Sequence, residues 1–474
     1  MGWGSRPPLE PTLLSGLAAS ARRILQLAWP AFIGQSAVLA FAIIDTLLVA
    51  RASPTDLAAL AVGSAAYITV FIGLMGVVIA LAPIVGQLYG AGRVQEAGRQ
   101  VHQAVWLAIG LSIIGSTLLA LPYPFLALAR AGPELGAKVQ GYLLALAFSL
   151  PASLLFTVYR GFNTAISRPK AVMKLQLAGL AIKIPLSTAL VFGWPAVGLP
   201  ALGVVGCGIA TAVAMWSQAL AALWMLRRDA SYAPFELLGR GLDRPQWPAL
   251  KEQMRLGIPM GASIMVEVTG FAFMAIFIAR LGTTPVAAHQ LAVNVVSVLF
   301  MLPLAFGNAT STLVAQRIGA ADPIDARRLA WHGLTLACVV ALVLGSAVFA
   351  LRAQVLGLYT SDAAILAAAL PLVAWLTVFH LADALQIMAA FVLRAYKIVT
   401  VPMCIYVAAL WGVGLGGGYL LAFNVSGNVP AWLQGARGYW AASTTGLLLA
   451  GVALTALLAW VLNKSASQER RRRG

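Results

Sequence analysis

Residues 256–281 read LGIPMGASIMVEVTGFAFMAIFIARL, a long apolar segment with one acidic residue, Glu267, near its middle. A run of this length matches the ~20 residues that cross the hydrocarbon core of a bilayer. Glu267 is therefore predicted to lie inside the membrane. Because a carboxylate costs roughly 2.5–3.5 kcal/mol there on insertion scales, we expect it to face a protein-lined or watery cavity and to titrate.

The composition of the whole chain is typical of an integral membrane protein. Of its 474 residues, 61% are hydrophobic and only 10% are charged, which a folded water-soluble protein could not keep in solution. Apolar runs of 18 or more residues predict twelve transmembrane helices. These runs lie at about 24–50, 57–82, 100–121, 138–159, 171–193, 203–226, 256–279, 286–313, 329–351, 364–393, 400–422 and 438–462.

Basic residues are distributed unevenly between the loops. If the N-terminus is inside the cell, the inner segments hold 25 Lys and Arg residues, the outer segments hold 6, and Lys183 lies within a helix. The positive-inside rule then predicts that both termini are cytoplasmic in a multi-pass plasma-membrane protein. The net charge of +17 is read as contact with lipid, and nucleic acid is not expected as a partner.

The first half of the chain recurs in the second half in a single register. Sliding one half over the other aligns residues at several helix ends without a gap: Pro30 with Pro259, Arg51 with Arg280, Gln87 with Gln316 and Gly90 with Gly319. Each half has an even number of spans, so the repeats are parallel and related by an axis along the membrane normal. We expect an all-α integral membrane protein with twelve transmembrane helices in two six-helix bundles related by pseudo-two-fold symmetry.

The repeat predicts five divisions of the chain. These are a cytoplasmic N-terminal segment (1–23), an N-terminal lobe of helices 1–6 (24–226), a cytoplasmic linker (227–255), a C-terminal lobe of helices 7–12 (256–462) and a basic cytoplasmic tail (463–474). Parallel six-helix repeats around a central cleft are typical of carriers that work by alternating access.

Two acidic residues of the C-terminal lobe are predicted to lie at one depth. Glu267 is 12 residues from the inner flank of its helix, and Asp383 is 11 residues from the inner flank of its own, so both lie roughly 17 Å above that flank. Such carboxylates repel when both are ionised and will share a proton or bind a cation, sodium included. The alternative is that helix-to-helix hydrogen bonds satisfy each acid.

Further polar side chains are candidates for the cleft or for a shell around the two acids. His380 and Gln386 share the face of Asp383, and a proton relay through His380 and a hydrogen-bonded spectator role are both compatible with its position. The eighth helix contributes three more, which line the cavity or join helices: His289, Gln290 and Asn294.

The N-terminal lobe carries one acid and one base where the membrane is expected. Asp45 is predicted to be its only intramembrane acid. Lys183 either pairs with a carboxylate or extends its stem to water in the cleft, because an unpaired ammonium costs a few kcal/mol in the membrane. Ser187, one turn from Lys183, and Thr211 are further cleft candidates.

Several of these stretches together resemble the multidrug and toxic compound extrusion (MATE) family, and its bacterial NorM-type branch in particular. The resemblance covers nearly all of residues 20–460 and is carried by FAIIDTLLVAR (41–51), KIPLSTALVFG (183–193), ALGVVGCGIATA (201–212), ASIMVEVTGFAF (262–273), VAAHQLAVNVVSVLFMLPLAFGNATSTLVAQRIGA (286–320) and ADALQIMAAFVLRAYK (382–397).

The resemblance implies an antiporter that exports organic, often cationic, compounds in exchange for sodium ions or protons, with no cofactor besides the coupling ion. It implies ion-coupling roles for Asp45, Glu267 and Asp383. It also places helix 5 beside helix 1, where Lys183 and Ser187 replace the two Asn residues usual in the family. We hypothesise that the Lys183 ammonium takes the place of a sodium ion at Asp45, and we expect a monomer in the inner membrane.

Two other functions are compatible with parts of the pattern. A flippase for a lipid-linked or other amphiphilic substrate needs cationic groups to hold pyrophosphate, and Lys183 is the one Lys or Arg found away from the ends of the predicted spans. An intramembrane protease could use Asp45 and Asp383, but neither lies in a GxGD sequence and the chain has no HExxH motif. The sequence therefore favours transport and predicts no enzyme.

Overall fold

The computed structural model describes residues 13–121, 123, 126, 132–194, 198, 200–238 and 241–473, so half of the predicted N-terminal segment lies outside the described residues. The described part contains twelve helices that are long and apolar enough to cross a bilayer, as predicted. These spans are Gly16–Ala52, Pro54–Gly90, Val94–Ala120, Pro133–Ala165, Pro169–Phe192, Val204–Arg228, Trp247–Ala279, Thr283–Gly319, Pro323–Ala350, Leu376–Ala395, Thr400–Ala422 and Ala436–Ser465.

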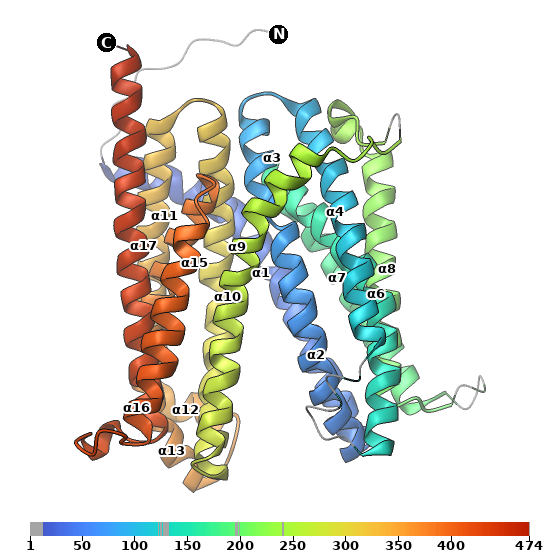
Figure 1. Ribbon diagram of the computed structural model, residues 1–474, viewed down its shortest axis with the longest axis vertical. Coiled ribbons are helices and arrows are strands. Elements are labelled where there is room, and N and C mark those ends of the chain that lie inside the picture. The colour runs from blue at the N-terminus through green and yellow to red at the C-terminus, as the bar shows by residue number, and fades with distance from the viewer. Residues whose placement is uncertain are drawn as a thin grey trace.

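The helices form two bundles that lie side by side (Figure 1). The first bundle consists of α1 (Leu13–Ala52), α2 (Pro54–Val78), α3 (Leu81–Gly90), α4 (Val94–Ala120), α6 (Pro133–Ala165), α7 (Pro169–Phe192) and α8 (Val204–Arg228). The short helix η2 (Ala230–Phe235) leads to the second bundle: α9 (Trp247–Ala279), α10 (Thr283–Gly319), α11 (Pro323–Ala350), α12 (Arg352–Gly357), α13 (Ala363–Val373), α14 (Leu376–Ala395), α15 (Thr400–Tyr406), η3 (Val407–Gly417), α16 (Gly418–Ala422), η4 (Ala431–Leu433) and α17 (Ala436–Arg473).

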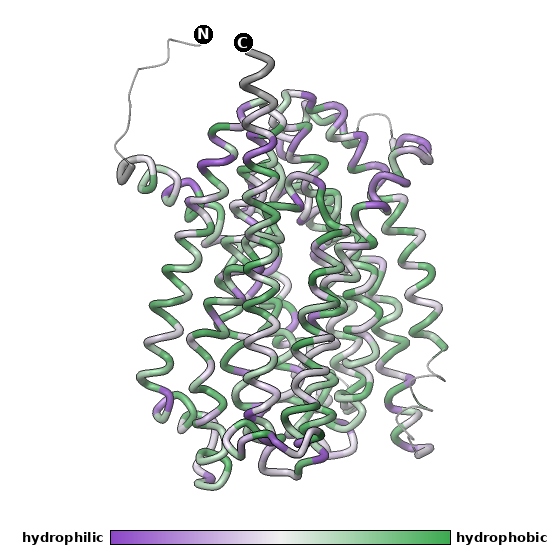
Figure 2. Tube along the Cα trace, turned by 60° about the vertical axis from the view of Figure 1, so that its left-hand side comes forward, coloured by the Kyte–Doolittle hydropathy of each residue, from purple (hydrophilic) through white to green (hydrophobic). Residues whose placement is uncertain are grey.

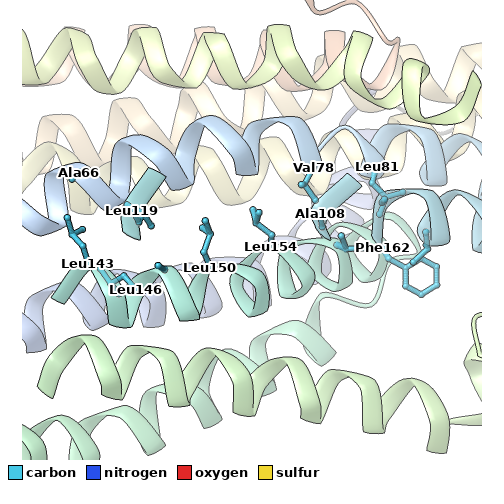
Figure 3. Packing of buried hydrophobic residues seen from close by; sticks show 14 of the residues in the cluster. Ala66, Val78, Leu81, Ala108, Leu119, Leu143, Leu146, Leu150, Leu154 and Phe162 are labelled. Carbon is cyan, nitrogen blue, oxygen red and sulfur yellow. The ribbon is translucent and has the colours of Figure 1, made fainter. Parts of the chain in front are cut away.

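Each bundle has its own apolar core. In the first, a row of leucines on α6 faces α2 and α4 (Figure 3): Leu143, Leu146, Leu150 and Leu154 are buried beside Ala66, Val78, Ala108 and Leu119. The second bundle is built around α14, which packs on α10, α11 and α17. Two separate cores allow the bundles to move as bodies while the packing inside each is kept.

Two helices cross from one bundle to the other. The first turns of α1 pack into the core of the second bundle through Ile24 and Ala28, and its later turns pack on α7. In α9, Leu256 and Met260 pack on α3 of the first bundle, and the later turns join the second core. Each helix contains a proline near the crossing, Pro30 in α1 and Pro259 in α9, and these prolines are partners in the sequence repeat.

Three of the predicted runs are not continuous α-helices. The run at 57–82 is divided between α2, which ends at Val78, and α3, which begins at Leu81. The run at 364–393 is divided into α13 and α14, with Pro371 close to the end of α13. The run at 400–422 contains η3, a π-helical segment between α15 and α16. Hydropathy does not distinguish these geometries, because a kinked or π-helical segment is as apolar as a straight one.

The bundles contact each other at the end where α3 turns into α4 and α10 turns into α11, uppermost in Figure 1. Hydrophilic residues gather at that same end (Figure 2). A Cβ atom on Gly90 would lie 1.9 Å from the main-chain oxygen of Gln316, and a Cβ on Gly319 would lie 1.8 Å from that of Gln87. Both sites thus require glycine, and the repeat predicted from the sequence recurs as a symmetric contact between the bundles.

Candidate functional site

Asp383 is held in a polar chain inside the second bundle. Its side chain is buried, and the amide of Gln386, one turn along α14, donates a hydrogen bond of 3.0 Å to Oδ1. The hydroxyl of Tyr406 on α15 donates in turn to Oε1 of Gln386. Within the described residues the second oxygen, Oδ2, has no hydrogen-bond partner. One carboxylate oxygen is therefore fixed and the other is open to a cation or a proton.

Glu267 reaches the same place from α9. Arg394 and Gln386 both lie near Glu267, Gln386 also contacts Asp383, and the two carboxylates lie within electrostatic range of each other. The two acids thus lie in the same part of the second bundle, while their equal depth and their coupling role stay predictions.

A small cavity of about 30 Å³ adjoins Glu267. It is lined by Phe271, Met274 and Phe379 and by the π-helical segment η3 through Leu410, Gly414 and Leu415. A volume of this size has room for a water molecule or for a small ion that has lost most of its water. The carboxylate is the charged group of an otherwise largely apolar lining.

The predicted histidines have different surroundings. His289 is buried against Trp440, whose indole N–H donates to its Nδ1 over 3.3 Å. An indole only donates, so Nδ1 must be unprotonated, and His289 joins α10 to α17. His380 is buried one turn from Asp383, and within the described residues its Nε2 has no partner.

Gln290 and Asn294 lie on a more exposed face of α10. The amide of Gln290 donates to the side-chain oxygen of Asn294 over 3.4 Å. This contact is within one helix and gives neither residue a partner on another helix. Their predicted role in the cleft stays a prediction.

In the first bundle Lys183 and Asp45 form an ion pair. Nζ of Lys183 on α7 lies 2.9 Å from Oδ2 of Asp45 on α1, with the lysine side chain fully buried and that of the aspartate 10% exposed. The ammonium also donates to the hydroxyl of Thr211 on α8. The helices α1, α7 and α8 thus bring together three of the predicted residues. The sequence left open whether Lys183 pairs with a carboxylate or extends to water, and in the structure it is paired with Asp45.

The environment of this pair contains two further features. Ser187 is fully buried one turn from Lys183, and within the described residues its hydroxyl has no partner. A second acid of this lobe, which the sequence did not single out, is also buried: Asp56, near the start of the span Pro54–Gly90. That Asp45 is the only intramembrane acid of this lobe stays a prediction. Asp56 lies in the first turn of α2, where the helix N-terminus favours an acid, and pairs with Lys138 over 3.2 Å.

Comparison with known proteins identifies the family. The MatE family model matches residues 30–188 and again residues 259–420. The chain belongs to the MATE family. The two matches begin at Pro30 and Pro259, which the repeat in the sequence aligns with each other, so each bundle of this MATE transporter contains one match to the family model.

Curated relatives place the protein in the NorM-type branch. It is 38% identical over 442 residues to "Probable multidrug resistance protein NorM" of Aromatoleum aromaticum. The alignment covers 93% of this chain and 94% of that protein. It is 34% identical over 450 residues to "Multidrug resistance protein PmpM" of Pseudomonas aeruginosa, covering 94% and 92% of the two chains.

Solved structures share the fold of this NorM-type transporter. The eukaryotic MATE transporter AtDTX14 superposes with a TM-score of 0.84 at 22% identity, covering 96% of this chain and 99% of that one. A MATE family transporter solved in an outward-facing conformation gives a TM-score of 0.85 at 17% identity, covering 94% and 97%. The family match, the curated relatives and the twelve apolar spans together make the protein a multi-pass membrane transporter.

Some residues of the site were not predicted from the sequence. Tyr406 lies in an apolar run, and the sequence gives no signal that its hydroxyl reaches Gln386. Gln87 and Gln316 did stand out in the repeat, but their contacts with the opposite bundle are visible only in the structure.

Proposed function

We propose that this transporter is a secondary antiporter that exports organic compounds, cationic ones in particular, in exchange for sodium ions or protons. The observation that carries the proposal is the pair of carboxylates, Glu267 and Asp383, beside one glutamine in the second bundle, with a small cavity next to Glu267. No cofactor is needed for such a cycle besides the coupling ion.

The chemistry of the pair supports ion coupling. Two carboxylates in a poorly solvated site repel when both are ionised, so a proton or a small cation between them lowers the free energy of the site. Oδ2 of Asp383 and the carboxylate of Glu267 supply oxygen ligands of the kind that hard cations prefer. A positively charged substrate that neutralises either acid competes with that ion, and such competition is what antiport requires.

The contacts between the bundles support alternating access. Gln87 donates to the main-chain oxygen of Ala395 over 2.7 Å, and Gln316 donates to that of Ala165 over 2.7 Å. Both bonds cross between the bundles at the end that carries the α3–α4 and α10–α11 turns. We assign that end to the cytoplasm of a bacterial inner-membrane protein, with both chain termini on that side, so the conformation is closed to the inside.

The substrate class is inferred from the relatives and from the lining of the cavity. The relatives named NorM and PmpM are called multidrug resistance proteins. The cavity of about 30 Å³ is too small for an organic cation in this conformation. Once it widens, Phe271, Phe379 and Met274 offer apolar and polarisable surface next to the negative charge of Glu267, which suits flat organic cations. A flippase is not favoured, because the buried base Lys183 is already neutralised by Asp45. We take the functional unit to be a monomer.

Transport in proteoliposomes tests the proposal. Export of a fluorescent organic cation would be driven by a sodium gradient or a proton gradient, each imposed alone. Glu267→Gln and Asp383→Asn are expected to abolish gradient-driven export, because each amide removes the charge and keeps hydrogen bonding. Glu134→Gln, at a side chain that is 77% exposed, is the matched control. Export by both site variants at the wild-type rate would disprove the coupling role.

A further inference from the structure

The ammonium of Lys183 has a complete set of partners inside the first bundle. A lysine ammonium has three hydrogens to donate. One is directed at Oδ2 of Asp45 and one at the hydroxyl of Thr211, and the ammonium also lies 5.0 Å from the centroid of the Phe41 ring. The face of an aromatic ring attracts a cation, so Nζ has a carboxylate, a hydroxyl and an aromatic ring as favourable partners. The lysine is placed as a bound cation would be.

The groups around this ammonium are the kinds that bind a hard cation. Asp45 offers a carboxylate, one oxygen of which has no partner within the described residues. Thr211 offers a hydroxyl oxygen that contacts the ammonium. One turn from Lys183 on the same helix, the hydroxyl of Ser187 is buried and also without a partner there. Oxygen ligands of this kind, with one negative charge, suit a small monovalent or divalent cation. In this chain the position beside them is filled by an amino group that is covalently part of α7.

Other charged groups near Asp45 do not replace the lysine in this role. The titratable side chains that face Asp45 from neighbouring helices are Cys207 of α8 and Tyr142 of α6, both ordinarily uncharged at neutral pH. The next acid, Asp56, is paired with Lys138. Among the described residues, the charge of Asp45 is therefore balanced by Lys183.

We propose that Lys183 is a tethered cation that occupies the coupling-ion position at Asp45, so that the first bundle has no site for free sodium. The residue thereby determines ion specificity. A proton or a cationic substrate that reaches Asp45 must displace the lysine. Sodium does not displace it, because sodium is larger than a proton and makes no contacts that the lysine does not already make. The inference rests on the proposed ion-coupled cycle and concerns the bundle that does not contain Glu267 and Asp383.

Sodium binding to the first bundle can be measured without transport. The background variant Glu267→Gln/Asp383→Asn removes both acids of the second bundle, and thermal unfolding in detergent is followed with sodium or with choline at equal ionic strength. We expect no sodium-dependent rise in Tm for this background. Adding Lys183→Asn shortens the side chain and supplies an amide oxygen, so a saturable rise in Tm with sodium is expected. Adding Lys183→Met, which fills the space without an oxygen, should give none.

Two results would overturn the inference. One is a sodium-dependent rise in Tm of the background variant that Asp45→Asn removes. The other is a folded Lys183→Asn protein with no response to sodium. If the proteoliposome assay shows no export while Lys183→Asn gains sodium binding, the proposed function fails and the tethered cation stands.

A double-mutant cycle tests the pair independently of any gained site. Lys183→Met and Asp45→Asn should each lower Tm, because each leaves one buried charge without its partner. The double variant should lose clearly less than the sum of the two single losses. Strictly additive losses would show that the two side chains do not interact and would overturn the proposal.

Discussion

Gln87 and Gln316 make the same hydrogen bond in opposite directions. Each donates its side-chain amide over 2.7 Å to the last main-chain oxygen of a helix in the other bundle, Gln87 to Ala395 at the end of α14 and Gln316 to Ala165 at the end of α6. The two helix ends are followed by matching left-handed residues, Ser167 and Lys397. Internal symmetry thus builds a two-point latch between the bundles.

We predict that removing the latch favours opening at this end. A net hydrogen bond contributes about 0.5–1.5 kcal/mol, so losing both bonds in Gln87→Leu with Gln316→Leu should shift the ratio of open to closed molecules by roughly 5- to 150-fold. Spin labels at Arg99 and Arg328 would report a larger share of long distances. Gln354→Leu, on the exposed short helix α12, is the control. Unchanged distance distributions in the double variant would rule out the latch.

We predict a stronger effect from filling the glycine contact. An alanine at Gly319 would place its methyl carbon 1.8 Å from the main-chain oxygen of Gln87, which cannot turn aside as a side chain can. The bundles must separate there, so Gly319→Ala should lengthen the Arg99 to Arg328 distance and slow export. Gly161→Ala, in α6 with open space around the new methyl group, is the control and should do neither. Equal behaviour of the two variants would contradict the predicted contact.

The sequence predicts the architecture of this protein better than its local geometry. Twelve apolar runs, the internal repeat and the acids Glu267 and Asp383 could all be identified, because insertion in a bilayer constrains composition strongly and makes buried charge conspicuous. The division into α13 and α14, the π-helical η3 and the bond from Tyr406 to Gln386 could not, since kinks and side-chain partners depend on packing. Asp56 was missed because it lies outside the apolar run predicted for its helix.

We predict that the linker after the first bundle loses stability in acid. Hydrogen bonds from Ser231 and Arg168 lower the pKa of Asp229 to about 2. A carboxyl with a depressed pKa in the folded state stabilises the fold above its unfolded pKa, near 3.8, and this contribution disappears as the pH falls from about 4 to 2. Asp229→Asn should therefore have a lower Tm than wild type at pH 7, with the difference shrinking below pH 4. A difference that stays constant over this range would contradict the ion pair.

We predict that both termini and the α8–α9 linker face the cytoplasm. A tag after residue 473 or a cysteine at Ser231 should be protected from an impermeant reagent in intact cells. A cysteine at Gly427, in the exposed turn between α16 and α17, should be labelled from outside. Labelling of Ser231→Cys in intact cells would reverse the proposed orientation and with it the assignment of the closed end.

The most direct test of the central claim is to measure the ion that moves when the substrate moves. In proteoliposomes without an imposed gradient, addition of an organic cation on one side should drive sodium or protons to the opposite side through the wild-type protein. Glu267→Gln should show no such ion flux, because one of the two competing carboxylates is gone. Uptake of the organic cation by the wild-type protein with no counter-movement of either ion would contradict the antiport mechanism and the role of Glu267 and Asp383 in it.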